Sequence, residues 1–391
     1  MKTNHAIISV GMLLMVMVFH VSAQAPVAPG DPLPGATPRE FEEFRLGLED
    51  FREIEEAGEG LGPLFNGTGC ASCHNVPVIG GGSPMTELRV GARNADGSFR
   101  EVGGTTLFQI FSIPDHRCQA AIPAEATILA RRTSVPLFGA GLIEAIPDET
   151  LLALEDPFDR DRDGISGRAA IVTDVASGHQ RVGRFGWKAQ VATLLTFAGD
   201  AYTNEMGITN DLFPLEPRGG LSEARVRECD LVRDPEDFVD PRTGKRAIDN
   251  FEAFMKLLAP PARGAITDEA RTGEQVFAAV GCSSCHTPAL TTGANASAAL
   301  SRKTAALYSD LLLHDVGTGD GILQEAAQPN EIRTPALWGL RFRRALMHDG
   351  GSASPAEAIL RHGGEAAGVV ERYRSTTEPL RRALLAFLDS L

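Results

Sequence analysis

The sextet GCASCH at residues 69–74 returns as GCSSCH at residues 281–286. A CxxCH motif is the attachment signature of c-type haem, because two cysteines form thioethers with the haem and the adjacent histidine becomes an axial ligand of the iron. Two copies predict two covalently bound haems c, with a zinc site or a dithiol as the alternative. The predicted attachment and iron-binding residues are Cys70, Cys73, His74, Cys282, Cys285 and His286.

Residues 1–23 have the pattern of a secretory signal peptide. Lys2 precedes an uncharged apolar run, and the small residues Ser22 and Ala23 follow it. The run is shorter than the ~20 apolar residues of a spanning helix, so an uncleaved anchor is the weaker alternative. We therefore expect a periplasmic protein with no membrane span after signal cleavage, and cysteines in an oxidising compartment.

The size and charge of the chain restrict its architecture and its partners. The chain has 391 residues, 43% of them hydrophobic, which is enough for two compact domains. Its formal net charge of -14 argues against binding to nucleic acid or to anionic membranes. The acidity would suit a small basic electron-donor protein, although a solvated acidic surface is the commoner explanation.

Amphipathic helices are expected immediately before both haem motifs. Residues 37–58 open with a capping box formed by Thr37 and Glu40, and their apolar positions recur at helical spacing. Residues 267–281 carry an apolar stripe of Val276, Phe277 and Val280 before the second motif. Such a helix leading into CxxCH indicates a cytochrome-c-like domain.

The expected fold is mainly α, with two cytochrome-c-like haem domains and small β insertions in the N-terminal half. Strand-like runs occur at residues 85–92, 105–113, 125–132 and 168–175. The charged segment 230–246 has two prolines and no apolar periodicity, so we expect a domain boundary there. The predicted domains are residues 24–245 and 246–391.

Segments of the two halves also match loosely outside the motifs. RTSVPLFGAG at residues 132–141 is similar to RTPALWGLR at residues 333–341, and each follows its own CxxCH. This pattern indicates an old duplication of a haem domain, with chance similarity as the alternative.

The ordered set of such segments resembles the bacterial diheme cytochrome c peroxidase superfamily, and more closely its diheme oxidoreductase branch, which carries the label thiol oxidoreductase. The matching segments are GLGPLFNGTGCASCH, FGAGLIEAIPDE, DRDGISGR, GRFGWKAQ, NEMGITNDLFP, LYSDLLLHDVG, EIRTPALWGL and MHDGGSASPAEAILRHGGEA. The resemblance implies a periplasmic redox protein with one haem for chemistry and another for electron relay.

The second axial ligand of each iron decides between these roles, because an iron with two protein ligands has no place for a substrate. For haem two, Met347 is the predicted distal ligand, since relay haems in related peroxidases use methionine. His348 and His314 are the alternatives.

For haem one, the sequence has no histidine between His74 and His116, where the well-known peroxidases carry one that caps the active haem. We expect haem one to be open, or capped by a remote group such as His116, His179 or Met206.

Peroxide cleavage needs a group that moves a proton between the two oxygens. Glu144, in a segment that matches the family, is the predicted acid or base, and Gln190 is a lesser candidate. The alternative for Glu144 is an ordinary surface carboxylate without a catalytic role. Trp187 matches the region where related enzymes place a tryptophan between the haems, so we expect an electron stepping stone, with core packing as the alternative.

Asp159, Asp161 and Asp163 alternate before a glycine, as the oxygen ligands of calcium loops do. The twelfth loop position is Ala170 instead of glutamate, so a calcium site here would need further ligands, and a solvated acidic turn is the alternative. The two cysteines outside the haem motifs, Cys118 and Cys229, are expected to form a disulfide, with a redox-active thiol pair as the alternative.

These residues predict a peroxidase-like diheme oxidoreductase. Electrons from a small redox protein would enter at haem two, pass through Trp187, and reduce hydrogen peroxide or oxidise a protein or thiol partner at haem one. The alternative is a pure electron-transfer cytochrome with two saturated irons.

Overall fold

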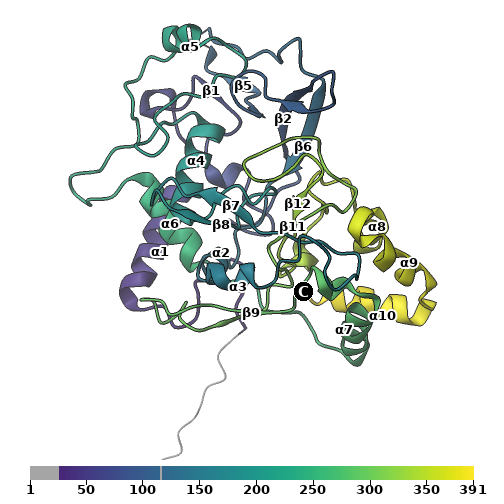
Figure 1. The fold of residues 1–391 in the computed structure, drawn as a ribbon. Helices are drawn as coiled ribbons and strands as arrows, with labels where there is room; N and C mark the ends of the chain where they lie inside the picture. The colour runs from purple at the N-terminus through teal and green to yellow at the C-terminus, as the bar shows by residue number, and fades with distance from the viewer. Residues whose placement is uncertain (1–25, 115–116) are drawn as a thin grey trace, which may run out of the picture.

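The computed structural model describes residues 26–114 and 117–391 (Figure 1). The predicted signal peptide and His116 lie outside these residues. The α-helices are α1 (Pro38–Phe51), α2 (Ala140–Glu144), α3 (Asp148–Leu152), α4 (Leu194–Met206), α5 (Glu223–Cys229), α6 (Ala247–Leu257), α7 (Asp268–Val280), α8 (Pro355–Arg361), α9 (Ala367–Ser375) and α10 (Glu378–Asp389).

The strands are short and form small antiparallel sheets. They are β1 (Leu64–Phe65), β2 (Thr86–Arg93), β3 (Phe99–Arg100), β4 (Leu107–Phe108), β5 (Phe111–Ser112), β6 (Ile128–Thr133), β7 (Ala170–Thr173), β8 (Gln180–Gly183), β9 (Leu290–Thr291), β10 (Thr304–Ala305), β11 (Leu313–His314) and β12 (Ile332–Arg333). More residues are helical than extended, which agrees with the predicted helical majority.

Helix α1 begins where the sequence predicts and ends earlier. The Thr37 hydroxyl accepts from the Glu40 N–H, and the Glu40 carboxylate accepts from the Thr37 N–H, which confirms the capping box. Phe44 and Phe51 are buried, whereas Ile54, beyond the end of the helix, is 71% exposed. The predicted apolar face therefore extends past the residues that the core covers.

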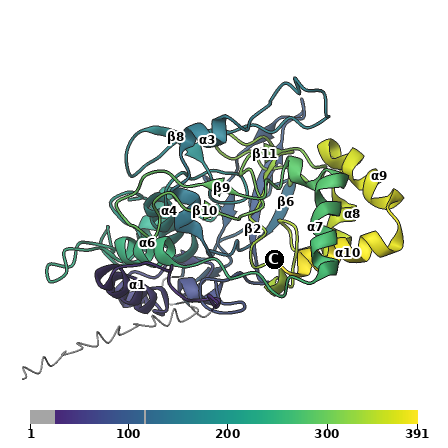
Figure 2. The same cartoon turned by 90° about the horizontal axis from the view of Figure 1, so that it is seen from below.

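Two helix pairs frame the molecule, α1 with α6 and α7 with α10 (Figures 1 and 2). Each pair crosses at a glycine where a side chain would not fit. A Cβ on Gly47 would lie 2.3 Å from the Asn250 carbonyl oxygen, and one on Gly273 would lie 1.9 Å from that of Ala383. Aromatic rings pack beside each crossing, so both helix pairs are held by the same kind of contact.

The same repetition extends to the segments that resemble each other in sequence. The N–H of Gly139 donates to the Leu258 carbonyl just after α6, and the N–H of Gly339 donates to the Leu391 carbonyl just after α10, both at 2.9 Å. This agreement supports the predicted duplication. Helix α6 follows the expected boundary at residue 245 but packs on α1, so the packing favours an end of the first half after α6.

The largest sheet lies in the N-terminal half, where β2 pairs with β3, β4 and β6. The expected strand at residues 105–113 is divided into β4 and β5, which pair with different partners. Gln109 lies between them with its side chain buried, and its Nε2 donates to the Asn204 carbonyl. This sheet carries residues of β2 toward the cavity described below.

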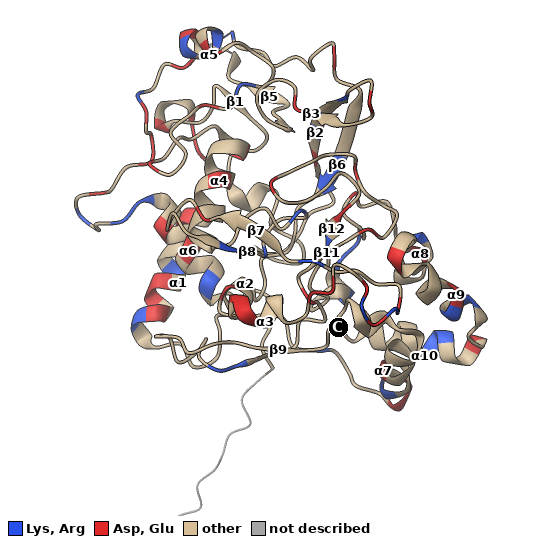
Figure 3. Cartoon of the chain, viewed as in Figure 1, with Lys and Arg blue, Asp and Glu red and all other residues tan. Residues whose placement is uncertain are grey.

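No helix in the described ranges is long and apolar enough to cross a membrane. Acidic and basic residues are interspersed along the outer helices, so the negative charge is not gathered on one element (Figure 3).

Candidate active site

The first CxxCH motif forms a single 3-10 turn, Cys70–Ser72, and both of its cysteines are free. His74 follows this turn, and its Nδ1 lies 3.0 Å from the Gly81 carbonyl oxygen. Because a carbonyl only accepts, this contact places the ring proton on Nδ1 and leaves Nε2 free to bind iron.

The second motif repeats this geometry. Cys282–Ser284 form a 3-10 turn, and the Nδ1 of His286 lies 2.9 Å from the Tyr308 carbonyl oxygen. Burial lowers the pKa of both motif histidines, that of His286 to about 4, so each imidazole is neutral at physiological pH. A neutral imidazole with a free Nε2 is the form that binds iron.

A cavity opens beside each motif histidine. The cavity at His74 has a volume of about 670 Å³ and extends between α4, β2 and the 323–325 segment of the second half. The cavity at His286 is narrower, about 180 Å³, and apolar residues of the C-terminal helices form much of its wall.

Among the described residues, each cavity contains a polar side-chain atom without a hydrogen-bond partner, as expected where the propionate groups or the edge of a haem would bind. The Nη2 of Arg132, in the first cavity, and the Nδ1 of His348, in the second, are buried and make no hydrogen bond in the described part of the chain. Arg343 also lines the second cavity, where burial lowers its pKa to about 10. The Nε and Nη1 of Arg132 already bind Asp320 and Gln324, and an anionic propionate would supply the partner that its Nη2 lacks.

Trp187 lies between the two cavities and lines both of them. Its side chain is buried, and its Nε1 donates to the Thr133 carbonyl oxygen at 2.7 Å. The Thr133 N–H in turn donates to the carbonyl oxygen of His348 at 2.8 Å. A hydrogen-bonded path thus links Trp187 to the second cavity, and its role as an electron stepping stone stays a prediction.

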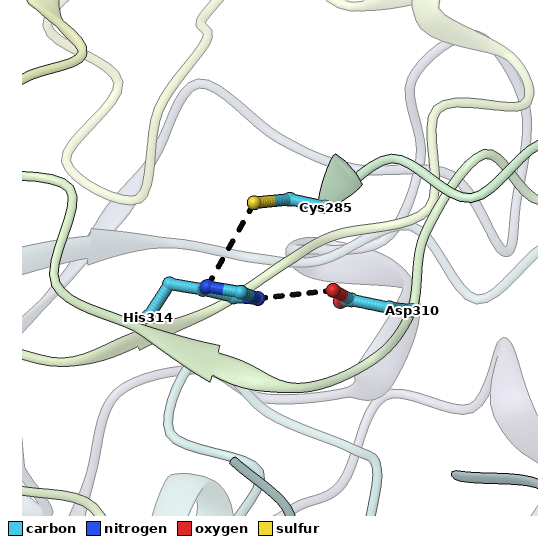
Figure 4. A group of neighbouring side chains, drawn as sticks. All are labelled: Cys285, Asp310 and His314. Carbon is cyan, nitrogen blue, oxygen red and sulfur yellow. Dashed lines mark hydrogen bonds and ion pairs between the residues drawn. The ribbon is translucent and has the colours of Figure 1, made fainter. Parts of the chain in front are cut away.

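His314 is not free to bind iron, although it was an alternative ligand for haem two. Asp310 lies 3.0 Å from its Nε2 (Figure 4). Glu365 lies 2.9 Å from its Nδ1, so both ring nitrogens are engaged. Cys285 lies 3.7 Å from the same Nδ1. Burial opposes a charge on the ring, but Asp310 and Glu365 outweigh it and raise the pKa of His314 well above its usual value.

Three other candidates line the second cavity: Met347, His348 and His362. His362 was not considered from the sequence. Its Nδ1 lies 2.7 Å from the Ala358 carbonyl oxygen, which leaves Nε2 free as in both motif histidines. Met347 stays a prediction, and His362 is the stronger candidate by this geometry. Its place at the end of α8, within a segment that resembles the family, was the signal in the sequence.

A cluster of charged residues lines the first cavity and was also missed from the sequence. The Arg89 guanidinium holds Glu87 through two contacts of 2.7 and 3.1 Å. Glu205, at the end of α4, accepts from the Asn66 amide at 3.0 Å and forms a hydrogen bond with Glu87. Burial and the neighbouring Glu87 raise the pKa of Glu205 above its usual range. Glu205 belongs to NEMGITNDLFP, a segment that resembles the family, which was the available signal.

Glu144 occupies a different position from the one predicted for a catalytic carboxylate. Its Oε1 accepts from the N–H of Leu194 at 2.7 Å, at the start of α4, and it is not among the residues that line the first cavity. A carboxylate at a helix N-terminus stabilises the helix dipole. The geometry therefore corrects the prediction and gives Glu144 a structural contact. Gln190 does line the cavity and accepts from the Lys188 N–H.

Among the described residues that line the first cavity, His74 is the only histidine. His179 lies on an exposed turn and does not line this cavity, whereas Met206 does. Of the two remote capping candidates among the described residues, Met206 lines the cavity and His179 does not, and His116 lies outside the described residues.

Two further predictions concern residues outside the cavities. Cys118 and Cys229 form a disulfide, as predicted. The carboxylates of Asp159, Asp161 and Asp163 offer oxygens within 4.8 Å of one another on a largely exposed loop. Their side chains also accept from N–H groups of their own loop, so the calcium site stays a prediction.

Two cavities that each offer a cysteine pair and a histidine with a free Nε2 define a two-centre haem protein of redox type. The chain belongs to the family described as "Di-haem oxidoreductase, putative peroxidase", which matches residues 113–391. The protein is therefore a peroxidase-like di-haem oxidoreductase. The first motif precedes the matched residues, so its assignment depends on the sequence and the cavity.

Solved structures are similar at a distant level. A hydrazine synthase from Kuenenia stuttgartiensis has 15% identity and a TM-score of 0.42, with 97% of this chain and 100% of that chain covered. A MauG-like protein associated with microbial copper homeostasis has 15% identity and a TM-score of 0.42, with 96% and 95% covered. The diheme peroxidase BthA from Burkholderia thailandensis has 14% identity and a TM-score of 0.42, with 91% and 86% covered. No curated protein matches the chain.

Proposed function

We propose that the protein is an exported, periplasmic c-type di-haem enzyme that reduces hydrogen peroxide at haem one with electrons relayed through haem two. One observation carries the proposal. The first cavity combines a single histidine, His74, with a half-buried acid, Glu205, whereas the second offers several candidate axial ligands and no acid among its described lining residues.

The residues of the first cavity have separate tasks. When bound, a haem on Cys70 and Cys73 supplies an iron that binds peroxide and exchanges electrons. Glu205 moves a proton between the two peroxide oxygens, and the Asn66 amide donates a hydrogen bond to its carboxyl group. Arg132 holds a propionate through its unpaired Nη2. Burial of these groups excludes bulk water and strengthens each contact.

The second cavity relays electrons. His286 together with His362 or Met347 would hold a haem there, and an iron held by two protein ligands would serve electron transfer and not substrate binding. Electrons arrive one at a time from a small redox protein, and Trp187 carries them to the first cavity. Reduction of one peroxide molecule to two waters consumes two electrons and two protons, so a second one-electron centre stores half of what the reaction needs.

A second candidate function is electron transfer without substrate chemistry. One observation favours it: Met206 is buried and lines the first cavity, where its thioether is a possible cap for the iron. A thiol pair as the reactive group is less well supported, because Cys118 and Cys229 are joined in a disulfide.

Peroxide turnover with a reduced small c-type cytochrome as donor tests the proposal. We expect Glu205→Gln to lower kcat by about 100-fold or more, the usual contribution of a general acid or base. Glu101→Gln, a change to another carboxylate in the wall of the same cavity, is the matched control and should keep wild-type turnover. Equal rates for the wild type and Glu205→Gln would refute the proposal, as would a wild type with no turnover.

A further inference from the structure

Glu87 comes into the first cavity from a strand, not from the helices that carry the haem motifs. Alternate residues of a strand point to the same face, so Glu87 and Arg89 of β2 lie side by side. Both line the cavity, as does Glu205 from the C-terminal end of α4. Strand β2 thus delivers a second carboxylate to the acid that the proposed function uses.

Contacts fix the two carboxyl groups against each other. Arg89 holds both oxygens of Glu87, and its Nη1 donates to the Thr106 hydroxyl at 3.2 Å, which locks the guanidinium in place. Glu205 is anchored by Asn66 and forms a hydrogen bond with Glu87. Two carboxyl groups in hydrogen-bonding contact share a proton, because two adjacent negative charges repel each other in a buried site.

Several charged groups face this pair from the surrounding elements. Arg132 of β6 acts on Glu87, as does Asp200 of α4. Glu325, from the second half, faces Asp200, and the Cys73 thiol faces both carboxyl groups before haem attachment removes its proton. Arg89 acts on both carboxyl groups, whereas Arg132 is a named influence on Glu87, which is also the one that Arg89 holds by hydrogen bonds.

The two carboxyl groups consequently titrate in opposite directions. Burial opposes a charge on Glu87, but Arg89 and Arg132 outweigh it and hold the pKa of Glu87 below its usual range. Burial and the charge on Glu87 raise the pKa of Glu205 above its usual range. At neutral pH the pair thus holds one proton, which lies on Glu205.

We propose that Glu87 and Glu205 form a carboxyl pair that shares one proton, in which Glu205 is the catalytic residue and Glu87 is the positioning residue that takes and returns the proton. The inference deepens the proposed function and rests on it. A pair with one proton has room for a second and can also give up the first, so it serves as acid and base in one cycle.

In the proposed cycle, Glu205 passes its proton to Glu87 and takes the proton from one of the two peroxide oxygens, so that both carboxyl groups are neutral. As the bond between the oxygens breaks, with two electrons from the donor protein, Glu205 gives a proton to the departing oxygen, which leaves as water. The remaining oxygen takes two protons from solvent and leaves as the second water, and the pair again holds one proton.

The test is the pH dependence of peroxide turnover by the two-haem enzyme and its Glu87 variants. Removal of the charge in Glu87→Gln also frees Arg89, and both changes favour the ionised form of Glu205. We expect the alkaline limb of the pH profile to move to lower pH by about one unit or more, with kcat reduced about 10-fold or more. Glu87→Asp should restore the position of the limb, and Glu101→Gln should not move it.

A wild-type alkaline limb in Glu87→Gln, with two haems bound per chain, would overturn the inference. If that variant does not fold, the infrared difference spectrum between wild type and Glu205→Gln at neutral pH decides, because other carboxyl groups such as Glu216 are also neutral there. Wild type should show a neutral carboxyl band that Glu205→Gln lacks. Identical spectra in this region would also overturn the inference. Failure of the proposed function itself looks different, because the wild type would then turn over no peroxide at any pH.

Discussion

The indole ring of Trp187 stands edge-on to the imidazole ring of His348, with ring centroids 6.2 Å apart and an interplanar angle of 72°. His348 faces the second cavity, and Trp187 lines both. The two rings therefore connect the centres that the proposed function assigns to relay and to chemistry.

Trp187→Phe should slow electron transfer from haem two to haem one by about tenfold or more, which corresponds to about 1.4 kcal/mol on the barrier. Phenylalanine has a smaller ring, so less of the distance between the cavities is bridged by an aromatic side chain. It also has no N–H to donate to the Thr133 carbonyl oxygen, and this loss should lower the free energy of unfolding by about 1–3 kcal/mol. Rapid reduction of haem two with optical detection of haem one measures the rate. Trp338→Phe, a change to the other tryptophan of the chain, is the control, and equal rates in both variants would contradict the assignment.

His362→Ala should change the spin state of haem two. If His362 supplies the distal nitrogen, its removal leaves His286 as the sole protein ligand, so the optical and magnetic signature should change from six-coordinate low-spin to high-spin. Met347→Leu should leave that signature unchanged. The reverse result, with loss of the low-spin signal only in Met347→Leu, would restore methionine as the ligand.

The disulfide between Cys118 and Cys229 should contribute strongly to stability. It joins residues 111 positions apart, and the chain-entropy treatment gives about 4 to 5 kcal/mol for a loop of that length. We expect the double variant Cys118→Ser with Cys229→Ser to unfold at lower urea concentration while haem content and turnover persist. Unchanged stability under oxidising conditions would show that the link has no such effect, and lost turnover with an intact fold would indicate a redox role.

His314→Gln should destabilise the fold by about 3–5 kcal/mol, because it leaves Asp310 and Glu365 without their buried cation. The pKa of His314 is higher in the folded protein than in the unfolded chain. Its contribution to the free energy of unfolding is therefore complete below the unfolded-state pKa and is lost as pH rises through the folded-state pKa. Glu365 has its pKa lowered to about 2, chiefly by His314 against burial, so its contribution is lost only as pH falls toward 2. Urea unfolding at several pH values measures both limbs, and a variant as stable as wild type at pH 6 would contradict the ion-pair assignment.

The sequence predicts the elements whose causes are local. The capping box at Thr37, the helix before Cys282 and the strand at β2 follow from spacing that a few neighbouring residues define. The disulfide of Cys118 and Cys229 was also accessible, because those two cysteines are what remains after the haem motifs are assigned.

The missed residues depend on contacts made through space. Glu205 gains its chemistry from Glu87 on a distant strand, and no local pattern records that pairing. Glu144 lies in a family segment, but the start of α4 takes up its carboxylate. His362 and His286 are far apart in the sequence, and only the folded second half places the free Nε2 of His362 at the cavity of His286.

The most direct test of the account is the electron paramagnetic resonance spectrum of the fully oxidised two-haem protein, recorded before and after addition of hydrogen peroxide. An open haem one should give a high-spin ferric signal that disappears with peroxide, together with a low-spin signal from haem two. Two low-spin signals that peroxide leaves unchanged, even after partial reduction of the protein, would contradict an open haem one and leave an electron-transfer cytochrome.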